Sequence, residues 1–232
     1  MRKHAVRVDH GLLFLGGGKM PMSKEFERRD FLCEVRAESD EELGNIIVGR
    51  PIVYESMTDL GYFNEVIARN ALINTDLTDV RFLVNHDMNK IPLARSRRNN
   101  GNSTMQLTVD DHGLSIRVTL DVENNAEAKS LYSAVKRQDI TGMSFAFRVD
   151  DEEWADLETE HPTRTIKSIS KVIEVSAVTF PAYDATEIQA RSKDALDSAR
   201  ADLERSRQQR AAEVDTSELE LAKAKMLFKS KN

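Results

Sequence analysis

The chain has 232 residues, of which 40% are hydrophobic and 31% charged, and its formal net charge is −6. This composition is typical of a soluble globular domain with appended segments. Direct nucleic-acid binding is not expected, because binders of this class usually carry a basic excess, and no apolar run approaches the roughly 20 residues of a membrane span. The single cysteine, Cys33, excludes an intrachain disulfide framework and suits a reducing cytoplasm.

Composition divides the chain into three parts. Residues 1–29 are expected to form a flexible N-terminal arm, and their Gly16-Gly17-Gly18-Lys19 run lacks the spacing of a phosphate-binding loop. Residues 30–186 are expected to form the folded domain. Residues 187–232 contain no Gly or Pro and are rich in helix formers, which predicts a charged helical tail. Its apolar stripe of Leu196, Ala199 and Leu203 fades by Arg210, so a solvated or partner-docking helix is favoured over a coiled coil.

Short strands dominate the expected domain. Strands are predicted over 31–38, 45–55, 80–84, 91–96, 103–109, 113–121, 142–149 and 165–180. A short helical piece is expected over 66–72, an amphipathic helix over 125–138, and an acidic loop over 150–162. The turn residues of 110–113 predict a hairpin. These elements indicate an α+β, mainly β fold, a barrel or sandwich with helices around it.

The predicted strand 142–149 alternates. Met143, Phe145 and Phe147 are expected to point one way, toward a core, and Ser144 the other way. Gly142, which has no side chain, lets another backbone or a substrate come close. Ser144 is therefore either a nucleophile or a small residue in a strand.

Of the five histidines, only His86 stands at the end of an apolar strand. Phe82, Val84 and His86 are predicted to share an inward face. The imidazole is either a hydrogen-bonded structural group or a catalytic base whose tautomer Asn85 or Asp87 fixes. No second histidine, cysteine cluster or His-Glu-x-x-His pattern offers metal-ligand spacing, so no metal or cofactor is expected. A metal-dependent hydrolase built around His86 and Asp87 stays an alternative.

Glu174 lies within the apolar run Val172–Val178. A carboxylate buried there costs several kcal/mol unless it is paired. It therefore either has a partner, such as an imidazolium, an arginine or backbone N–H groups, or occupies a half-exposed edge position. A serine, a histidine and a carboxylate together can carry out nucleophilic acyl transfer, and sequence spacing does not restrict such triads.

Several strings, in this order, resemble the prohead (capsid-maturation) proteases of tailed bacteriophages. They are Gly49–Tyr54, Phe63–Ile67, Val84–Asp87 with Ile91–Ala94, Gly113–Ile116, Gly142–Phe147, and Glu174–Ala182. The resemblance covers about residues 45–186. One departure is Ala94, where the family more often has glycine.

The resemblance implies a serine endopeptidase related in fold to the herpesvirus assemblins, an antiparallel β-barrel surrounded by helices. It implies Ser144 as nucleophile and His86 as base. Glu174 fits the third position best, with Asp87 as a weaker alternative. His161, the only histidine after the serine, is the other residue considered, because a second histidine follows the serine in the herpesvirus relatives.

The same resemblance implies action inside the assembling prohead, in the host cytoplasm. The expected substrates and partners are scaffold segments, the major capsid protein and the protease itself, with self-association. The charged tail is expected to dock on scaffold or shell. The alternative is a non-catalytic capsid or scaffold component that keeps the protease fold.

Overall fold

The computed structural model describes residues 4–8, 11–15, 26–32, 35–40, 44–179 and 192–209, and its strands form two sheets. The nine-stranded sheet consists of β1 (His4–Val8), β2 (Gly11–Leu15), β3 (Glu27–Leu32), β6 (Met57–Asp59), β7 (Asn64–Ile67), β8 (Asp79–Val84), β9 (Ala94–Arg97), β12 (Gly142–Ala155) and β13 (Thr163–Val178). The four-stranded sheet has the order β10 (Met105–Asp110), β11 (Gly113–Leu120), β5 (Gly44–Val53), β4 (Val35–Asp40).

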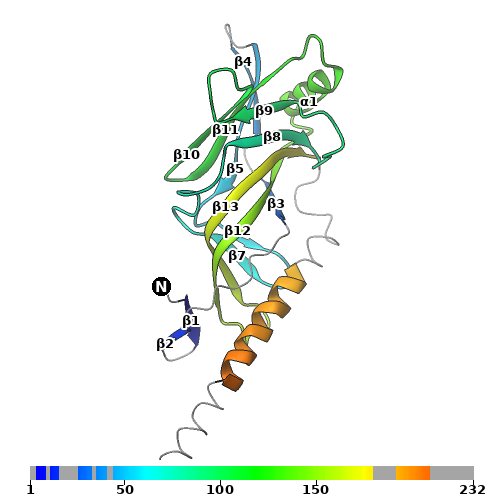
Figure 1. Cartoon of the computed structure of the whole chain (residues 1–232). Helices are drawn as coiled ribbons and strands as arrows, with labels where there is room; N and C mark the ends of the chain where they lie inside the picture. The colour runs from blue at the N-terminus through cyan, green and yellow to red at the C-terminus, as the bar shows by residue number, and fades with distance from the viewer. Residues whose placement is uncertain are drawn as a thin grey trace, which may run out of the picture.

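The long antiparallel hairpin β12–β13 runs through the large sheet (Figure 1). At one end β12 pairs with β1, and β13 pairs with β7. At the other end β3 lies beside β12, and β8 runs parallel to the last residues of β13. Between the two ends the hairpin register shifts several times, from Ala146 to Glu152. Because bulges bend strands, the hairpin is curved. The shorter strands β1 and β7 pair with one end of it, and β3 and β8 pair with the other.

The main core lies where the large sheet, the small sheet and helix α1 (Ala126–Lys136) meet. Met143, Phe145 and Phe147 are each 0% exposed and belong to this core, as the alternation predicts. The predicted helix is confirmed as α1, and it starts because the side chain of Asn125 accepts hydrogen bonds from the first free amides, those of Glu127 and Ala128.

The predicted hairpin at residues 110–113 is confirmed as β10–β11. Gly113 has φ of +134°, and a Cβ there would lie 2.0 Å from the carbonyl oxygen of Ile52. Only glycine fits this close approach of the turn to β5.

Other expectations about the fold are corrected. A mainly β fold is confirmed, but the sheets of the described residues do not close into a barrel, and α1 and the helix over residues 192–209 do not form a surrounding ring. The helical piece expected over 66–72 is wrong, because Val66 and Ile67 belong to strand β7, whose ladder with β13 outweighs local helix propensity. The acidic loop is shorter than expected, since β12 continues to Ala155. The strand expected over 31–38 is two strands, β3 and β4.

The first part of the predicted helical tail is a helix over residues 192–209, drawn in orange in Figure 1. The predicted stripe faces the protein: Leu196 and Ala199 are buried against Phe63, Trp154 and Leu157, with Leu203 partly buried beside them. Arg200 donates to the carbonyl of Leu157 at 3.0 Å. Residues 187–191 and 210–232 of the expected tail lie outside the described residues, as do Cys33 and most of the expected arm. Strand β3, however, begins at Glu27, before the expected domain start at residue 30.

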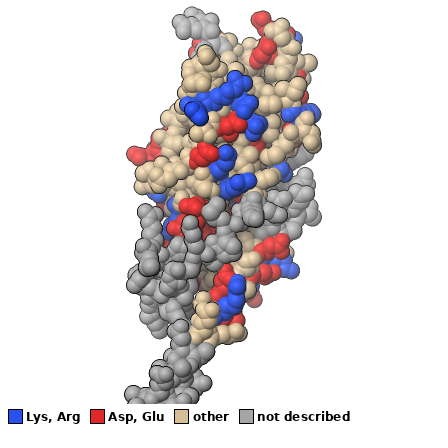
Figure 2. Space-filling model, viewed as in Figure 1, with Lys and Arg blue, Asp and Glu red and all other residues tan. Residues whose placement is uncertain are grey.

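Acidic and basic side chains are interspersed on the face shown in Figure 2, where no single sign covers the described surface. Neither described helix is long and apolar enough to cross a lipid bilayer.

Candidate functional site

Strand register brings two serines side by side. Ser144 of β12 lies directly opposite Ser176 of β13, and Ser176 in turn pairs with Leu83 of the parallel strand β8. Opposite residues in an antiparallel pair point to the same face, with Cβ atoms about 5 Å apart. Both serines are 0% exposed, on the face opposite to the core residues Phe145 and Val175.

His86 reaches this face through a left-handed turn. Strand β8 ends at Val84, and Asn85 and His86 then have φ values of 50° and 59°. For residues with a Cβ this region costs on the order of 1 kcal/mol each, so the turn needs support. Asn85 supplies part of it, because its side-chain oxygen accepts from the amide of Thr179 at 2.9 Å.

This turn corrects one prediction. The imidazole does not continue the inward row of Phe82 and Val84, since it contacts Glu174, which lies on the other face of β13 from Val175, the partner of Phe82. A strict two-residue alternation predicted the wrong face because the strand ends two residues before the histidine.

The imidazole and two side chains of β13 form a connected cluster. Nδ1 of His86 lies 2.5 Å from Oε1 of Glu174, and Oε2 of Glu174 accepts from the hydroxyl of Ser176 at 2.5 Å. The hydroxyl of Ser176 also accepts from the backbone N–H of His86 at 3.1 Å. The His86 side chain is 12% exposed and that of Glu174 only 1%. Ala146 lies opposite Glu174 on β12, so its small side chain leaves room for the carboxylate.

Ser144 lies beside this cluster, with its hydroxyl turned the other way. Its Oγ donates to the backbone carbonyl of Arg29 in β3 at 2.9 Å. Within the part of the chain that the structure describes, no hydrogen bond joins Ser144 to His86. The structure therefore joins His86 to Glu174 and places Ser144 one strand away, on the same face, with its proton on another acceptor.

The two alternatives for the third position lie elsewhere. The carboxylate of Asp87 accepts from the amide of Asn89 at 3.1 Å within the exposed β8–β9 loop. His161 precedes β13, and its Nε2 lies 3.3 Å from both Asn64 Oδ1 and Asp59 Oδ1. It is thus at the far end of β13 from Glu174, about 40 Å along the strand at about 3.3 Å per residue.

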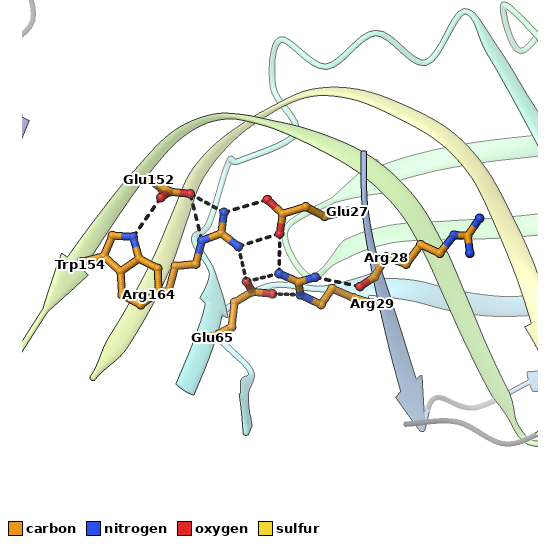
Figure 3. A network of polar contacts seen from close by, with 7 residues as sticks. All are labelled: Glu27, Arg28, Arg29, Glu65, Glu152, Trp154 and Arg164. Atoms are coloured by element: carbon orange, nitrogen blue, oxygen red, sulfur yellow. Dashed lines mark hydrogen bonds and ion pairs between the residues drawn. The ribbon is translucent and has the colours of Figure 1, made fainter. Parts of the chain in front are cut away.

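A buried ion network lies under the bend of the β12–β13 hairpin (Figure 3). Arg29 of β3 binds Glu65 of β7 in a bidentate pair, with Nη2 and Oε2 2.7 Å apart. Arg164 of β13 also contacts Glu65, at 3.0 Å, and binds Glu27 through two bonds of 2.7 and 2.8 Å. It completes the network with Glu152 of β12. The Arg29 and Arg164 side chains are 6% and 3% exposed.

The network has two consequences. Burial alone would raise the pKa of Glu27, but the charges and hydrogen bonds of Arg164 and Arg29 outweigh it and lower this pKa from 4.5 to about 2. The network also ties β3 to β7 and β13, and so holds the Arg29 carbonyl on Ser144. Sequence reasoning missed Ser176 and the network. Two signals were available: Ser176 follows Glu174 by two residues on one strand face, and Glu65 stands in the largely apolar string Phe63–Ile67.

An imidazole held by a buried carboxylate through Nδ1 has its other ring nitrogen on the side away from that carboxylate. A base oriented in this way can take a proton from a neighbouring hydroxyl and stabilise the resulting imidazolium. Among the described residues, no group of three or more His, Cys, Asp or Glu side chains is arranged to hold a metal ion.

Comparisons with known proteins add to this geometry. A sequence profile of the caudovirus prohead serine proteases matches residues 33–199, a range that contains His86, Ser144 and Glu174. No curated protein sequence matches the chain. Among solved structures, the chain is similar to the capsid assembly protease of bacteriophage T4, at 12% identity and a TM-score of 0.33, over 66% of this chain and 98% of that one.

Proposed function

The chain belongs to the caudovirus prohead serine protease family, and we propose that it cleaves peptide bonds with Ser144 as nucleophile, His86 as base and Glu174 as the carboxylate that orients the base. The observation that carries this assignment is the 2.5 Å contact of His86 Nδ1 with the buried Glu174, which lies on β13 two residues from Ser176, the partner of Ser144. A buried carboxylate bonded to Nδ1 selects one tautomer and favours the imidazolium.

The reaction follows from these roles. Ser144 Oγ attacks the carbonyl carbon of the scissile bond while His86 takes its proton, and the C–N bond breaks as His86 passes that proton to the leaving amine. Water then attacks the acyl-enzyme ester with His86 again as base, which releases the acid and restores the hydroxyl. Glu174 orients the imidazole through Nδ1 in both steps.

One rearrangement precedes the attack. The Ser144 hydroxyl must exchange the Arg29 carbonyl for the imidazole as acceptor. We expect a rotation about χ1 of Ser144 to make this exchange, in which each neutral hydrogen bond is worth on the order of 1 kcal/mol net.

We propose as substrates the scaffold segments and major capsid protein of the prohead, and the protease itself. Family membership supports this, since a prohead is the immature capsid. The proposed place of action is the interior of the assembling prohead in the host cytoplasm, with self-association of the protease. Mass spectrometry of prohead proteins produced together with the protease tests it: new termini are expected with the wild type and none with Ser144→Ala.

A fluorophosphonate probe tests the chemistry directly. It forms an Oγ–P bond and loses fluoride, and labelling is expected at Ser144 with the wild type and not with Ser144→Ala or His86→Ala. Cleavage and labelling that persist in both variants would exclude this site. A folded wild type that neither labels nor cleaves would favour the non-catalytic capsid component, and activity lost to a chelator and restored by a divalent ion would favour the metal-dependent alternative.

A further inference from the structure

Ser176 uses its hydroxyl in both directions inside the candidate site. It accepts the backbone N–H of His86 at 3.1 Å and donates to Oε2 of Glu174 at 2.5 Å. A serine hydroxyl can donate one proton and also accept a hydrogen bond. The Ser176 hydroxyl therefore links the backbone of His86 to the carboxylate of Glu174. At 0% exposure, water does not compete for these bonds.

The backbone of His86 needs this acceptor. The residue lies beyond the end of β8, in a left-handed conformation, where the ladder with β13 no longer supplies a carbonyl for its amide. The preceding amide, that of Asn85, still finds the carbonyl of Ala177 at 3.0 Å. The hydroxyl of Ser176 thus replaces the missing ladder carbonyl as acceptor for the His86 amide, and this bond fixes the position of the His86 backbone relative to β13.

The carboxylate of Glu174 also needs this donor. Its Oε1 faces His86 Nδ1, which leaves Oε2 buried at a residue that is 1% exposed. A buried carboxylate oxygen without a donor disfavours ionisation and leaves the group free to rotate. The Ser176 bond to Oε2 fixes the plane of the carboxylate, and this plane directs the imidazole.

We propose that Ser176 is a positioning residue of the protease: it holds the Glu174 carboxylate and the His86 backbone so that the imidazole is presented toward Ser144. This proposal rests on the proposed roles of Ser144, His86 and Glu174. Among the described residues no hydrogen bond joins Ser176 to Ser144, and Ser176 acts through Glu174 and His86.

The test uses the full chain and a fluorophosphonate probe, with the labelling rate kinact and the probe constant KI measured separately from pH 5 to 9. Ser176→Ala is expected to lower kinact by roughly 10- to 100-fold, as small misplacements of catalytic groups do, with KI nearly unchanged. Its pH profile is expected to shift, because the carboxylate that favours the imidazolium is no longer held. Ser176→Thr keeps the hydroxyl and is expected to restore most of the rate.

The matched control is Ser96→Ala. Ser96 is likewise a strand serine at 0% exposure, but its hydroxyl has no hydrogen-bond partner among the described residues. Loss of this oxygen is expected to leave kinact and the pH profile unchanged. If Ser176→Ala does not fold, Ser176→Thr is compared with Ser176→Cys, whose thiol is a weak donor. A slower Cys variant supports the proposal, and equal rates for the two contradict it.

The outcomes separate this proposal from the function that it rests on. Labelling that survives Ser144→Ala overturns the proposed function. Labelling that requires Ser144 but is unaffected by Ser176→Ala, in both rate and pH profile, overturns the positioning role and leaves the function standing. A loss of rate in Ser176→Ala that Ser176→Thr does not restore also counts against the positioning role.

Discussion

Glu65→Gln is the most informative change to the buried ion network of Figure 3. The substitution keeps the shape of the side chain and removes its charge. Glu65 is 2% exposed and contacts both Arg29 and Arg164, whose side chains are 6% and 3% exposed. In the variant, the two guanidinium groups lie in the same buried space, and an uncharged amide replaces the carboxylate between them.

The expected loss follows from this burial. Breaking a buried ion pair by removing one partner typically costs about 3–5 kcal/mol, because the remaining charge stays desolvated. Glu27, which contacts both Arg29 and Arg164, and Glu152, which contacts Arg164, still compensate part of the charge. The free energy of unfolding is therefore expected to fall by about 3 kcal/mol, a large part of the 5–15 kcal/mol that holds a typical domain together.

Urea unfolding followed by tryptophan fluorescence measures this loss. Trp154 is the only tryptophan, and its indole N–H donates to Glu152 of the same network at 2.9 Å. The matched control is Glu153→Gln, the neighbour on β12 whose partner is the half-exposed Lys167. That surface pair is worth about 0–1 kcal/mol. Equal midpoints for the two variants would refute the claim that the network stabilises the fold by tying β3 to β7 and β13.

Three further predictions concern the carboxylates and the helix over residues 192–209. Glu174→Gln is expected to lower the fluorophosphonate labelling rate by about 10³- to 10⁴-fold, as loss of the orienting carboxylate does in other triads. Asp87→Asn is expected to leave the rate within about twofold. A large loss with Asp87→Asn and a small one with Glu174→Gln would make Asp87 the third member of the triad. The pKa of Glu27 is about 2 in the fold against 4.5 ordinarily, so its contribution to stability is fully present above pH 4.5 and is lost as the pH falls toward 2. Urea midpoints measured between pH 4.5 and 2 should therefore depend less on pH in Glu27→Gln than in the wild type. The same pH dependence in both proteins would contradict the lowered pKa of Glu27. Leu196→Ala, which removes a 3% exposed side chain beside Trp154, is expected to cost about 2–4 kcal/mol and to shift the indole emission to the red; an unchanged midpoint and emission would show that the helix is not docked there in solution.

Local patterns predicted the parts of the fold that depend on neighbours in sequence. The helix α1 follows from its cap at Asn125 and its spacing of apolar residues, and the β10–β11 hairpin follows from the turn that ends at Gly113. Val66 and Ile67, the last two residues of strand β7, were predicted as helix, because local propensity does not report the ladder with β13, about 100 positions away, that holds them. The barrel was expected from the resemblance, and the strand pattern had left a barrel or a sandwich open, because closure depends on strand pairings that short-range patterns do not contain.

The site shows the same division. Alternation placed Ser144 on the face opposite to the core, and the cost of burying a carboxylate left Glu174 either partnered or at a half-exposed edge; the structure shows it buried and bonded to His86 and Ser176. The face of His86 was predicted wrongly, because the turn at Asn85 and His86 reverses the direction that alternation assigns. The role of Ser176 depends on contacts with two other chain positions, one of them 90 residues away.

The amino-acid sequence by itself supplied the three residues that we propose as catalytic, a hydroxyl, an imidazole and a carboxylate in strand-like surroundings, and the order of motifs that places the chain in its family. Only the tertiary structure decided how they lie relative to one another. Three strands from distant parts of the chain, β8, β12 and β13, must align in one register before His86 contacts Glu174 beside Ser144. The register is set by core packing on one face and by buried ion pairs under the bend, and both are non-local terms in the free energy of the whole fold.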